Sequence, residues 1–174
     1  MKDIKYLGYY PGVVGKIIES HAVYYYENWG FDVTFETQVG EELSQFIHAF
    51  KPSRDVFWVA LKNKTFAGAI ALDGKEADTE GARIRWFIVP QPFQGLGIGS
   101  MLLKKAVEFC MDQKEIKNLF LWTFEGLDQA RLLYEREGFR LLEQHDVDQW
   151  GGAIREQKLN KCVSSPVLLG VGPS

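Results

Sequence analysis

Three glycines stand between an apolar run and a stretch of helical spacing, an arrangement that can bind a phosphate. Residues 83–89 form a partly β-branched apolar run, and residues 101–110 place apolar side chains at helical intervals. Gly95, Gly97 and Gly99 lie between them. The first turn of a helix has free N–H groups and a positive dipole end, and glycines let an anion approach the backbone. The predicted order of strand, glycine loop and helix therefore indicates an anion site.

The spacing of these glycines separates three kinds of phosphate site. A P-loop needs a lysine followed by Ser or Thr after its last glycine, and the lysine is absent. A dinucleotide-binding turn needs Gly-x-Gly-x-x-Gly, but Gly99 comes one residue early and Ser100 occupies the expected place. The third kind is a cradle for the pyrophosphate of coenzyme A, which both mismatches leave open.

Two motifs resemble the hallmarks of the GNAT superfamily of acyl-CoA N-acyltransferases. Residues 94–99, Gln-Gly-Leu-Gly-Ile-Gly, match the signature Gln/Arg-x-x-Gly-x-Gly/Ala, and Val89 and Pro90 precede them at the usual place. Residues 133–139, Leu-Tyr-Glu-Arg-Glu-Gly-Phe, are similar to the second hallmark, Leu-Tyr-x-x-x-Gly-Phe. The two motifs lie the expected distance apart, and the resemblance covers residues 4–160.

A finer similarity concerns the acetyltransferase module that is often fused behind a MarR-type winged-helix regulator. Residues 30–36, 121–123 and 156–159 resemble parts of that module. No DNA-binding half accompanies them in this sequence. The resemblance therefore implies a free-standing version of the module.

The superfamily resemblance implies where acetyl-CoA, the acyl donor, would bind. Backbone groups of Phe87, Ile88 and Val89 are expected to pair with the pantetheine arm like a missing strand, because sheet-edge groups need partners. Backbone N–H groups of the following residues are expected to bind the pyrophosphate: Gln94, Gly95, Leu96, Gly97, Ile98, Gly99 and Ser100. Leu127 departs from the family pattern, since many members have a cofactor-contacting asparagine there. No metal is expected, because neither histidines nor cysteines show metal-ligand spacing.

Acetyl transfer from a thioester to an amine needs a base, an oxyanion donor and an acid for the leaving thiolate. Tyr134 matches the family tyrosine that protonates the sulfur; the alternative is a packing tyrosine on an amphipathic helix. The resemblance implies that a backbone N–H near Val89 polarises the thioester carbonyl. Glu36 is the favoured base, because it follows an aromatic run expected to face the acceptor, but it can equally complement the dipole of the next helix. Glu125 is a second candidate for the base.

Two further residues are candidates for binding the acceptor. Arg85 lies in an otherwise apolar strand and, if it points into the cleft, can hold a substrate carboxylate in a bidentate pair. That orientation would favour a small acceptor resembling an amino acid; the alternative is an arginine that points to solvent. Trp122 can wall the acceptor pocket, although core packing explains it equally well.

The order of expected elements predicts a mixed α/β fold. Strands are expected at residues 4–7, 56–61, 65–72, 83–89, 118–123, 139–143 and 153–159, and helices at 17–29, 39–50, 99–113 and 127–137. A polar loop that holds Trp150 is expected at 146–152. The resemblance implies a GNAT-like fold, with a central mixed, mostly antiparallel sheet of about seven strands, flanked by four helices and splayed between strands 4 and 5.

Length and charge limit the remaining possibilities. The 174 residues fit a single domain at 1–162 and a C-terminal tail at 163–174 that has no period. The net charge of −3, with interspersed acids and bases, disfavours a nucleic-acid surface. No window approaches a membrane span, and the first residues lack an apolar signal core. We expect a cytoplasmic protein without nucleic-acid or membrane partners; a homodimer, common in the family that it resembles, stays open.

The leading prediction is an N-acetyltransferase that moves an acetyl group from acetyl-CoA to a primary amine by direct attack in a ternary complex. The acceptor stays open between small molecules, peptide N-termini and lysine side chains. The alternative is a non-catalytic acyl-CoA sensor or interaction module that uses the same loop without turnover. A nucleotide-binding enzyme of another kind is a more distant interpretation.

Overall fold

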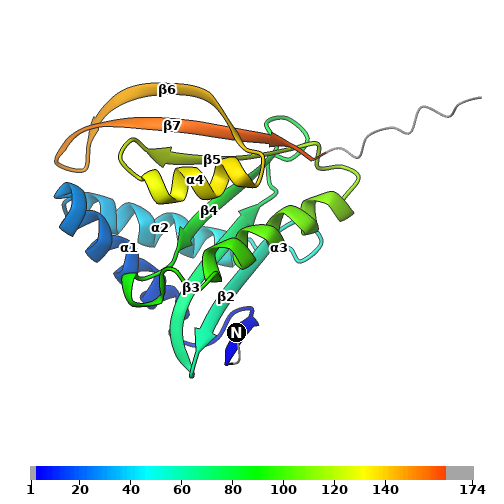
Figure 1. The fold of residues 1–174 in the computed structure, drawn as a ribbon, viewed down its shortest axis with the longest axis horizontal. Helices are drawn as coiled ribbons and strands as arrows, with labels where there is room; N and C mark the ends of the chain where they lie inside the picture. The colour runs from blue at the N-terminus through cyan, green and yellow to red at the C-terminus, as the bar shows by residue number, and fades with distance from the viewer. Residues whose placement is uncertain (1–2, 164–174) are drawn as a thin grey trace, which may run out of the picture.

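The computed structural model of the chain describes residues 3–163, which form a central sheet with helices on both faces (Figure 1). Apart from Val163, the predicted tail at 163–174 lies outside this range. No helix among the described residues combines the length and the apolar character that crossing a membrane requires. The elements in chain order are β1 (Ile4–Leu7), α1 (Val13–Trp29), α2 (Val33–His48), β2 (Val56–Lys62), β3 (Thr65–Asp73), β4 (Ala82–Ile88), the short 3₁₀ helix η1 (Gln91–Phe93), α3 (Ile98–Asp112), β5 (Asn118–Phe124), α4 (Asp128–Arg136), β6 (Arg140–Gln149) and β7 (Gly152–Cys162).

The seven strands form one sheet in the order β1-β2-β3-β4-β5-β7-β6. Neighbouring strands are antiparallel except β4 and β5, which run parallel and are joined by a crossover through α3. This mixed, mostly antiparallel sheet with four α-helices confirms the predicted fold class. The parallel pair matters most for function, because its strands end at the same edge of the sheet.

Helix α2 begins at Val33 rather than at Val39, where the sequence analysis placed its start. The side chain of Asp32 caps the helix by accepting a hydrogen bond from the N–H of Thr34 at 2.9 Å. Phe35 is buried on the same face as Val39, so the preceding aromatic run continues into the helix. Because polar residues separate Phe35 from Val39, the sequence alone did not indicate that the helix begins at Val33.

Strand β6 extends to Gln149, so the polar loop predicted at 146–152 is wrong. The hairpin instead turns at Trp150 and Gly151, whose φ angles of 58° and 93° fit a two-residue hairpin turn. Most residues of β6 are exposed, so the strand lacks the apolar alternation by which a half-buried strand is recognised.

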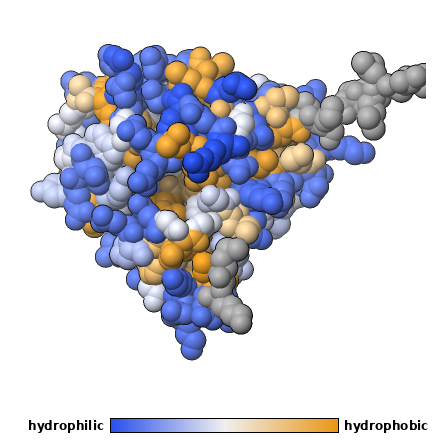
Figure 2. Space-filling model, in the orientation of Figure 1, coloured by the Kyte–Doolittle hydropathy of each residue, from blue (hydrophilic) through white to orange (hydrophobic). Residues whose placement is uncertain are grey.

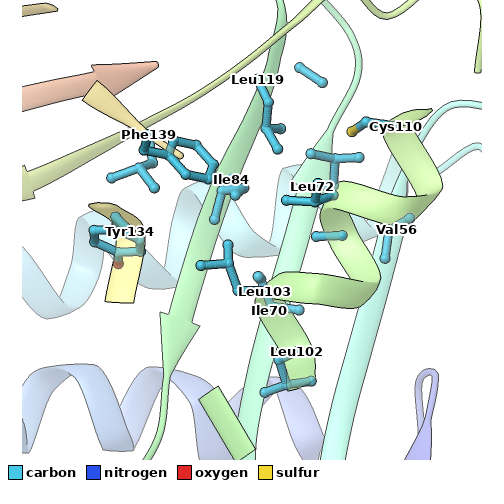
Figure 3. Packing of buried hydrophobic residues seen from close by; sticks show 14 of the residues in the cluster. Val56, Ile70, Leu72, Ile84, Leu102, Leu103, Cys110, Leu119, Tyr134 and Phe139 are labelled. Carbon is cyan, nitrogen blue, oxygen red and sulfur yellow. The ribbon is translucent and has the colours of Figure 1, made fainter. Parts of the chain in front are cut away.

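Two hydrophobic cores lie on opposite faces of the sheet. Ile70 belongs to the cluster beneath α3 and α4, whereas its neighbour Ala71 belongs to the cluster beneath α1 and α2. Leu103 of α3 and Leu43 of α2 anchor the two clusters. Figure 3 shows Tyr134 at the margin of the first cluster, with its hydroxyl directed away from the packed side chains. Helices therefore cover both faces of the sheet.

Candidate active site

A cleft opens where β4 and β5 separate. The parallel strands pair only over Ala82–Ile84 and residues 119–121, and beyond that point the described residues of β4 and β5 form no further pairs with each other. The backbone edges of the strand ends therefore face the cleft, which has a volume of about 1510 Å³. Figure 2 shows a hollow near the middle of the molecular surface, with hydrophobic residues at its base. The predicted splay between the fourth and fifth strands is confirmed.

The cleft has two halves that differ in their walls. We call the first the loop half; its walls are the end of β4, residues 94–100 and α4. We call the second the hairpin half; its walls are α1, α2, the cleft-facing side chains of β4 and β5, and the β6–β7 hairpin. The halves meet at the splay, so ligands in each can come into contact there.

The glycine loop leaves the first turn of α3 open to a ligand. Gly97 is the N-cap residue of α3, with a φ of 76°. No side chain caps this helix, and its first turn contains no acidic residue. Gly95 also has a positive φ, of 74°. The first bond of the helix runs from the N–H of Met101 to the carbonyl of Gly97 at 3.1 Å. The preceding N–H groups point out of the helix end, as an anion site requires.

The residues predicted to bind the acyl donor are brought together along the loop half. Phe87, Ile88, Val89 and the loop residues line the cleft, with the exception of Leu96, whose side chain is exposed outside the lining. The side-chain nitrogen Nε2 of Gln94 donates to the carbonyl of Val89 at 3.0 Å and ties the loop to the strand end. This arrangement fits the predicted placement of a pantetheine arm and a pyrophosphate.

Tyr134 is the one buried residue of α4, and it lines the cleft. Its ring lies 6.1 Å from that of Phe87, measured between centroids. Burial raises the pKa of the Tyr134 hydroxyl above its usual value, and the nearby phenol of Tyr24 acts in the same direction. The hydroxyl therefore keeps its proton at neutral pH, which a proton donor needs.

The tip of the β6–β7 hairpin closes one end of the hairpin half. The N–H of Asp32 donates to the carbonyl of Trp150 at 3.0 Å, and the indole Nε1 of Trp150 donates to Gln38 at 2.7 Å. The Trp150 ring packs against Phe31 and Phe35 at centroid distances of 5.1 and 5.3 Å. The tip is thereby fixed to the start of α2.

Arg85 faces the hairpin half beside a bulge in β4. The register against β3 shifts between Ala69 and Ala71, and Trp86 has a φ of 44°. The guanidinium of Arg85 consequently lies over the Trp86 ring, 4.1 Å from its centroid. It also pairs with Glu42 of α2 and, at 3.5 Å, with Asp73 of β3. Arg85 therefore faces the cleft, but carboxylates of the chain already bind it.

Arg83, two residues earlier on the same strand, has a hydrogen-bond donor without a partner among the described residues. It lines the cleft, and its Nε is buried without a hydrogen-bond partner within residues 3–163. Burial lowers the pKa of Arg83, and the positive charge of Arg85 adds to that effect. Because an arginine stays protonated in proteins, this guanidinium would gain from an anionic ligand.

A second polar group lies on the hairpin strands. Glu156 of β7 lines the cleft and faces His145 of β6, with 3.4 Å between Oε2 and Nε2. The His145 ring makes an edge contact with Trp122 at 5.3 Å between centroids. The Nζ of Lys158 lies 5.6 Å from the centroid of the Trp122 ring. Trp122 thus lines the hairpin half, and its role in binding an acceptor stays a prediction.

Glu36 does not lie in this site. It occupies the first turn of α2 with an exposed side chain, outside the residues that line the cleft. That position matches the alternative interpretation, an acid that complements the helix dipole. Glu125 is likewise exposed and outside the lining. Neither position supports the predicted role of a base.

The sequence analysis missed Arg83, Glu156 and His145. Arg83 shares the period-two alternation of Arg85, so a strand pattern could have suggested both. Glu156 and His145 pair across two strands, one of which was assigned partly to a loop. Without that pairing, nothing in the sequence brings the two residues together.

Comparison with known proteins gives one family and one curated relative. The sequence profile of the acetyltransferase (GNAT) family matches residues 16–139. A 90-residue segment is 32% identical to N-acetylaspartate synthetase from Danio rerio. That segment is 52% of this chain and 31% of the relative, so the chain spans about a third of the relative's length.

Solved structures of similar fold cover nearly the whole chain. A GNAT-family acetyltransferase from Staphylococcus aureus Mu50 superposes with a TM-score of 0.73 at 21% identity, over 92% of this chain and 99% of that one. RimL, a ribosomal L7/L12 alpha-N-protein acetyltransferase solved with coenzyme A, gives 0.71 at 12% identity, over 93% and 95%. Arabidopsis thaliana NAA60, solved with a bisubstrate analogue, gives 0.67 at 12% identity, over 91% and 97%. At these identities the likeness concerns the fold.

Proposed function

The chain belongs to the GNAT family, and we propose that it is an acetyl-CoA-dependent N-acetyltransferase whose acceptor is a small primary amine that carries a carboxylate. The observation that carries the proposal is Arg83. Its guanidinium lines the hairpin half, and its buried Nε has no partner in the described part of the chain. A carboxylate from the acceptor would supply the missing hydrogen bond to this guanidinium, whose positive charge Glu42, Asp73 and Glu156 also attract.

Arg85 supports this acceptor class indirectly. Glu42 and Asp73 occupy its donors, so these pairs hold the guanidinium against Trp86 and leave Arg83 as the arginine with an unpaired donor among the described residues. The name of the relative N-acetylaspartate synthetase denotes an acetylated amino acid with carboxylates. Its similarity concerns 90 residues only and therefore supports a chemical class rather than a particular amino acid.

The closed hairpin tip favours a small molecule over a polypeptide. The hydrogen bonds from Asp32 to Trp150 and from Trp150 to Gln38 join the α1–α2 connection to the β6–β7 turn. A peptide acceptor with its amine in the cleft would have to extend the rest of its chain out of the cleft, through an opening between such segments. With this end closed, the remaining space suits an acceptor of amino-acid size.

The loop half would bind acetyl-CoA. The N–H groups of Ile98, Gly99 and Ser100 precede the first helical hydrogen bond of α3 and would donate to the pyrophosphate. The unpaired strand edge at residues 87–89 would donate and accept along the pantetheine arm. Leu127 is the N-cap residue of α4 and makes no side-chain capping hydrogen bond. Because many family members have an asparagine at this position, binding of the cofactor there would depend on backbone groups in this chain.

Transfer would proceed by direct attack where the two halves meet. The amine nitrogen bonds to the thioester carbonyl carbon, a backbone N–H near Val89 stabilises the oxyanion, and the carbon–sulfur bond breaks. Tyr134 donates its phenol proton to the departing thiolate and recovers one from the nitrogen of the new amide. The net products are the N-acetylated acceptor and coenzyme A with a free thiol.

An amine panel with thiol release from acetyl-CoA as the readout tests this function. Aspartate and its diamide form a matched pair, and a tripeptide amide and Nα-acetyl-lysine amide represent the other acceptor classes, a peptide N-terminus and a lysine side chain. We expect turnover with aspartate-like amines and little with the diamide. Equal rates for the pair, or turnover of the tripeptide alone, would contradict the acceptor class. Binding of acetyl-CoA without turnover of any amine would favour the sensor.

A cytoplasmic location and a homodimer stay predictions. The location rests on the sequence pattern and the dimer on the family resemblance. Sedimentation of the purified chain would measure its assembly state.

A further inference from the structure

The His145–Glu156 pair offers a route for the proton that the acceptor must lose, if the proposed function holds. The two residues are direct cross-strand partners in the β6–β7 register. Their side chains meet at 3.4 Å. Glu156 lines the cleft, whereas His145 does not. The pair therefore begins in the hairpin half and ends outside it.

The exposure of the two side chains supports that direction. The Glu156 side chain is 17% exposed and that of His145 is 49% exposed. A proton collected on the inner carboxylate can move to the imidazole and then to water. Imidazole suits this passage because one ring nitrogen can accept a proton while the other releases one.

Burial and the neighbouring charges act on the pKa of Glu156 in opposite directions. Burial raises the pKa of Glu156, while His145 on β6 and Arg83 on β4 oppose that effect. Lys158 lies farther along β7 on the same face as Trp122. Other acids lining the cleft are Glu19 and Glu27 on α1, Glu42 on α2 and Asp128 on α4. A carboxylate whose pKa is raised toward neutrality is a better base than one with an ordinary pKa.

Other candidates lie in less suitable positions. Glu42 is bound to Arg85. Glu36 is exposed outside the cleft lining. His21 lines the cleft, but its Nδ1 bonds to the carbonyl of Ile17 at 2.8 Å inside α1. Among these groups, Glu156 combines cleft exposure with a partner that leads to solvent.

We propose that Glu156 is the general base of the acetyl transfer and that His145 carries the proton to solvent. The acceptor ammonium gives one proton to the Glu156 carboxylate and becomes a neutral amine, whose lone pair attacks the thioester. Glu156 then passes the proton to His145, and the imidazolium releases it to water. The thiolate receives its proton separately, from Tyr134, so each proton has one donor and one acceptor.

Glu156→Gln tests the base, with the pH profile of kcat as the readout. At neutral pH we expect a loss of about 10²- to 10⁴-fold in kcat, with the affinity for acetyl-CoA unchanged. The wild-type rate falls as the pH drops through the raised pKa of Glu156, and the variant lacks this acid limb. Its deficit shrinks as the pH approaches about 10, where an alkylamine loses its own proton.

His145→Gln tests the passage to solvent. Because His145 opposes the rise in the pKa of Glu156, its removal should move the acid limb to higher pH. Asp146→Asn is the matched control, since Asp146 is a hairpin carboxylate that pairs with Arg155 at 2.8 Å outside the cleft lining. The control should keep the wild-type profile.

The outcomes separate this inference from the proposed function. Wild-type turnover of carboxylate amines with an unchanged kcat and acid limb in Glu156→Gln would overturn the inference alone. A rate loss that stays constant at every pH would mean a structural role and would overturn it as well. Absence of wild-type turnover with every amine would instead remove the proposed function. Partial recovery of kcat in Glu156→Asp, with the acid limb restored, would support the base.

Discussion

The two halves of the cleft are built in different ways. Apart from α4, the loop half comes from residues 87–89 and 94–100, which lie close together in sequence and would act mainly through backbone groups. The hairpin half comes from α1, α2, β4, β5 and the β6–β7 hairpin, and it acts through side chains. A pyrophosphate needs only correctly placed N–H groups, whereas recognition of an acceptor needs specific charges. One half therefore suits a common donor and the other a particular acceptor.

The halves also differ in their response to pH. Residues 94–100 contain no titratable side chain, so the loop contributes none to donor binding. The hairpin half contains Glu156 and the buried His21, and His145 pairs with Glu156 from outside the cleft lining. Acid pH should therefore act first on the hairpin half. The following changes would test this difference, beginning with the largest effect.

Tyr134→Phe acts where the halves meet. Removing the phenol proton should lower kcat by about 10²- to 10⁴-fold, because general acid catalysis supplies that range. The affinity for acetyl-CoA, measured by calorimetry, should change little, since the ring still packs beside Phe87 and Phe139. An unchanged kcat would contradict the role of the tyrosine as a proton donor.

His21→Leu tests the acid sensitivity of the wall formed by α1. Burial lowers the pKa of His21 to about 4, below its usual value of 6.5. The unfolded chain then binds more protons than the folded chain, so stability is complete above pH 6.5 and declines as the pH falls toward 4. The decline should reach up to roughly 3 kcal/mol in wild type and be smaller in the variant. Urea unfolding at several pH values measures it; equal slopes would refute the prediction.

Gly97→Val should weaken the loop half alone. A β-branched residue disfavours the φ of 76°, although no atom lies within 4 Å of the position of the added Cβ. The strain of roughly 1–2 kcal/mol should weaken acetyl-CoA binding by about 5- to 30-fold. The KM for the acceptor should stay near its wild-type value. A change in acceptor KM alone would contradict the division into halves.

Glu36→Gln should have the smallest effect. Its side chain is exposed on α2 and lies outside the cleft lining. Kinetic constants and the pH profile should stay within about twofold of wild type, as for most surface substitutions. Loss of the acid limb in this variant would restore Glu36 as the base and remove that role from Glu156.

The sequence predicted the two halves unequally, for the same reason that they are built differently. The glycine loop and the Tyr134 motif are short local patterns, and the structure places both at the cleft. Arg83, His145 and Glu156 come together only through sheet register, which the polar composition of β6 concealed. The bulge likewise places Trp86 under the guanidinium of Arg85, and no local pattern indicates that contact.

The most direct test of the acceptor site combines Arg83→Met with the pair of aspartate and its diamide. In wild type, kcat/KM should be higher for aspartate, and the variant should lose about 10- to 150-fold for aspartate, the equivalent of about 1.5–3 kcal/mol for a hydrogen bond to a charged group. The diamide should react with both proteins at nearly the same rate. Equal losses for both amines would show that Arg83 supports the fold rather than the acceptor carboxylate, and would contradict the proposed acceptor class.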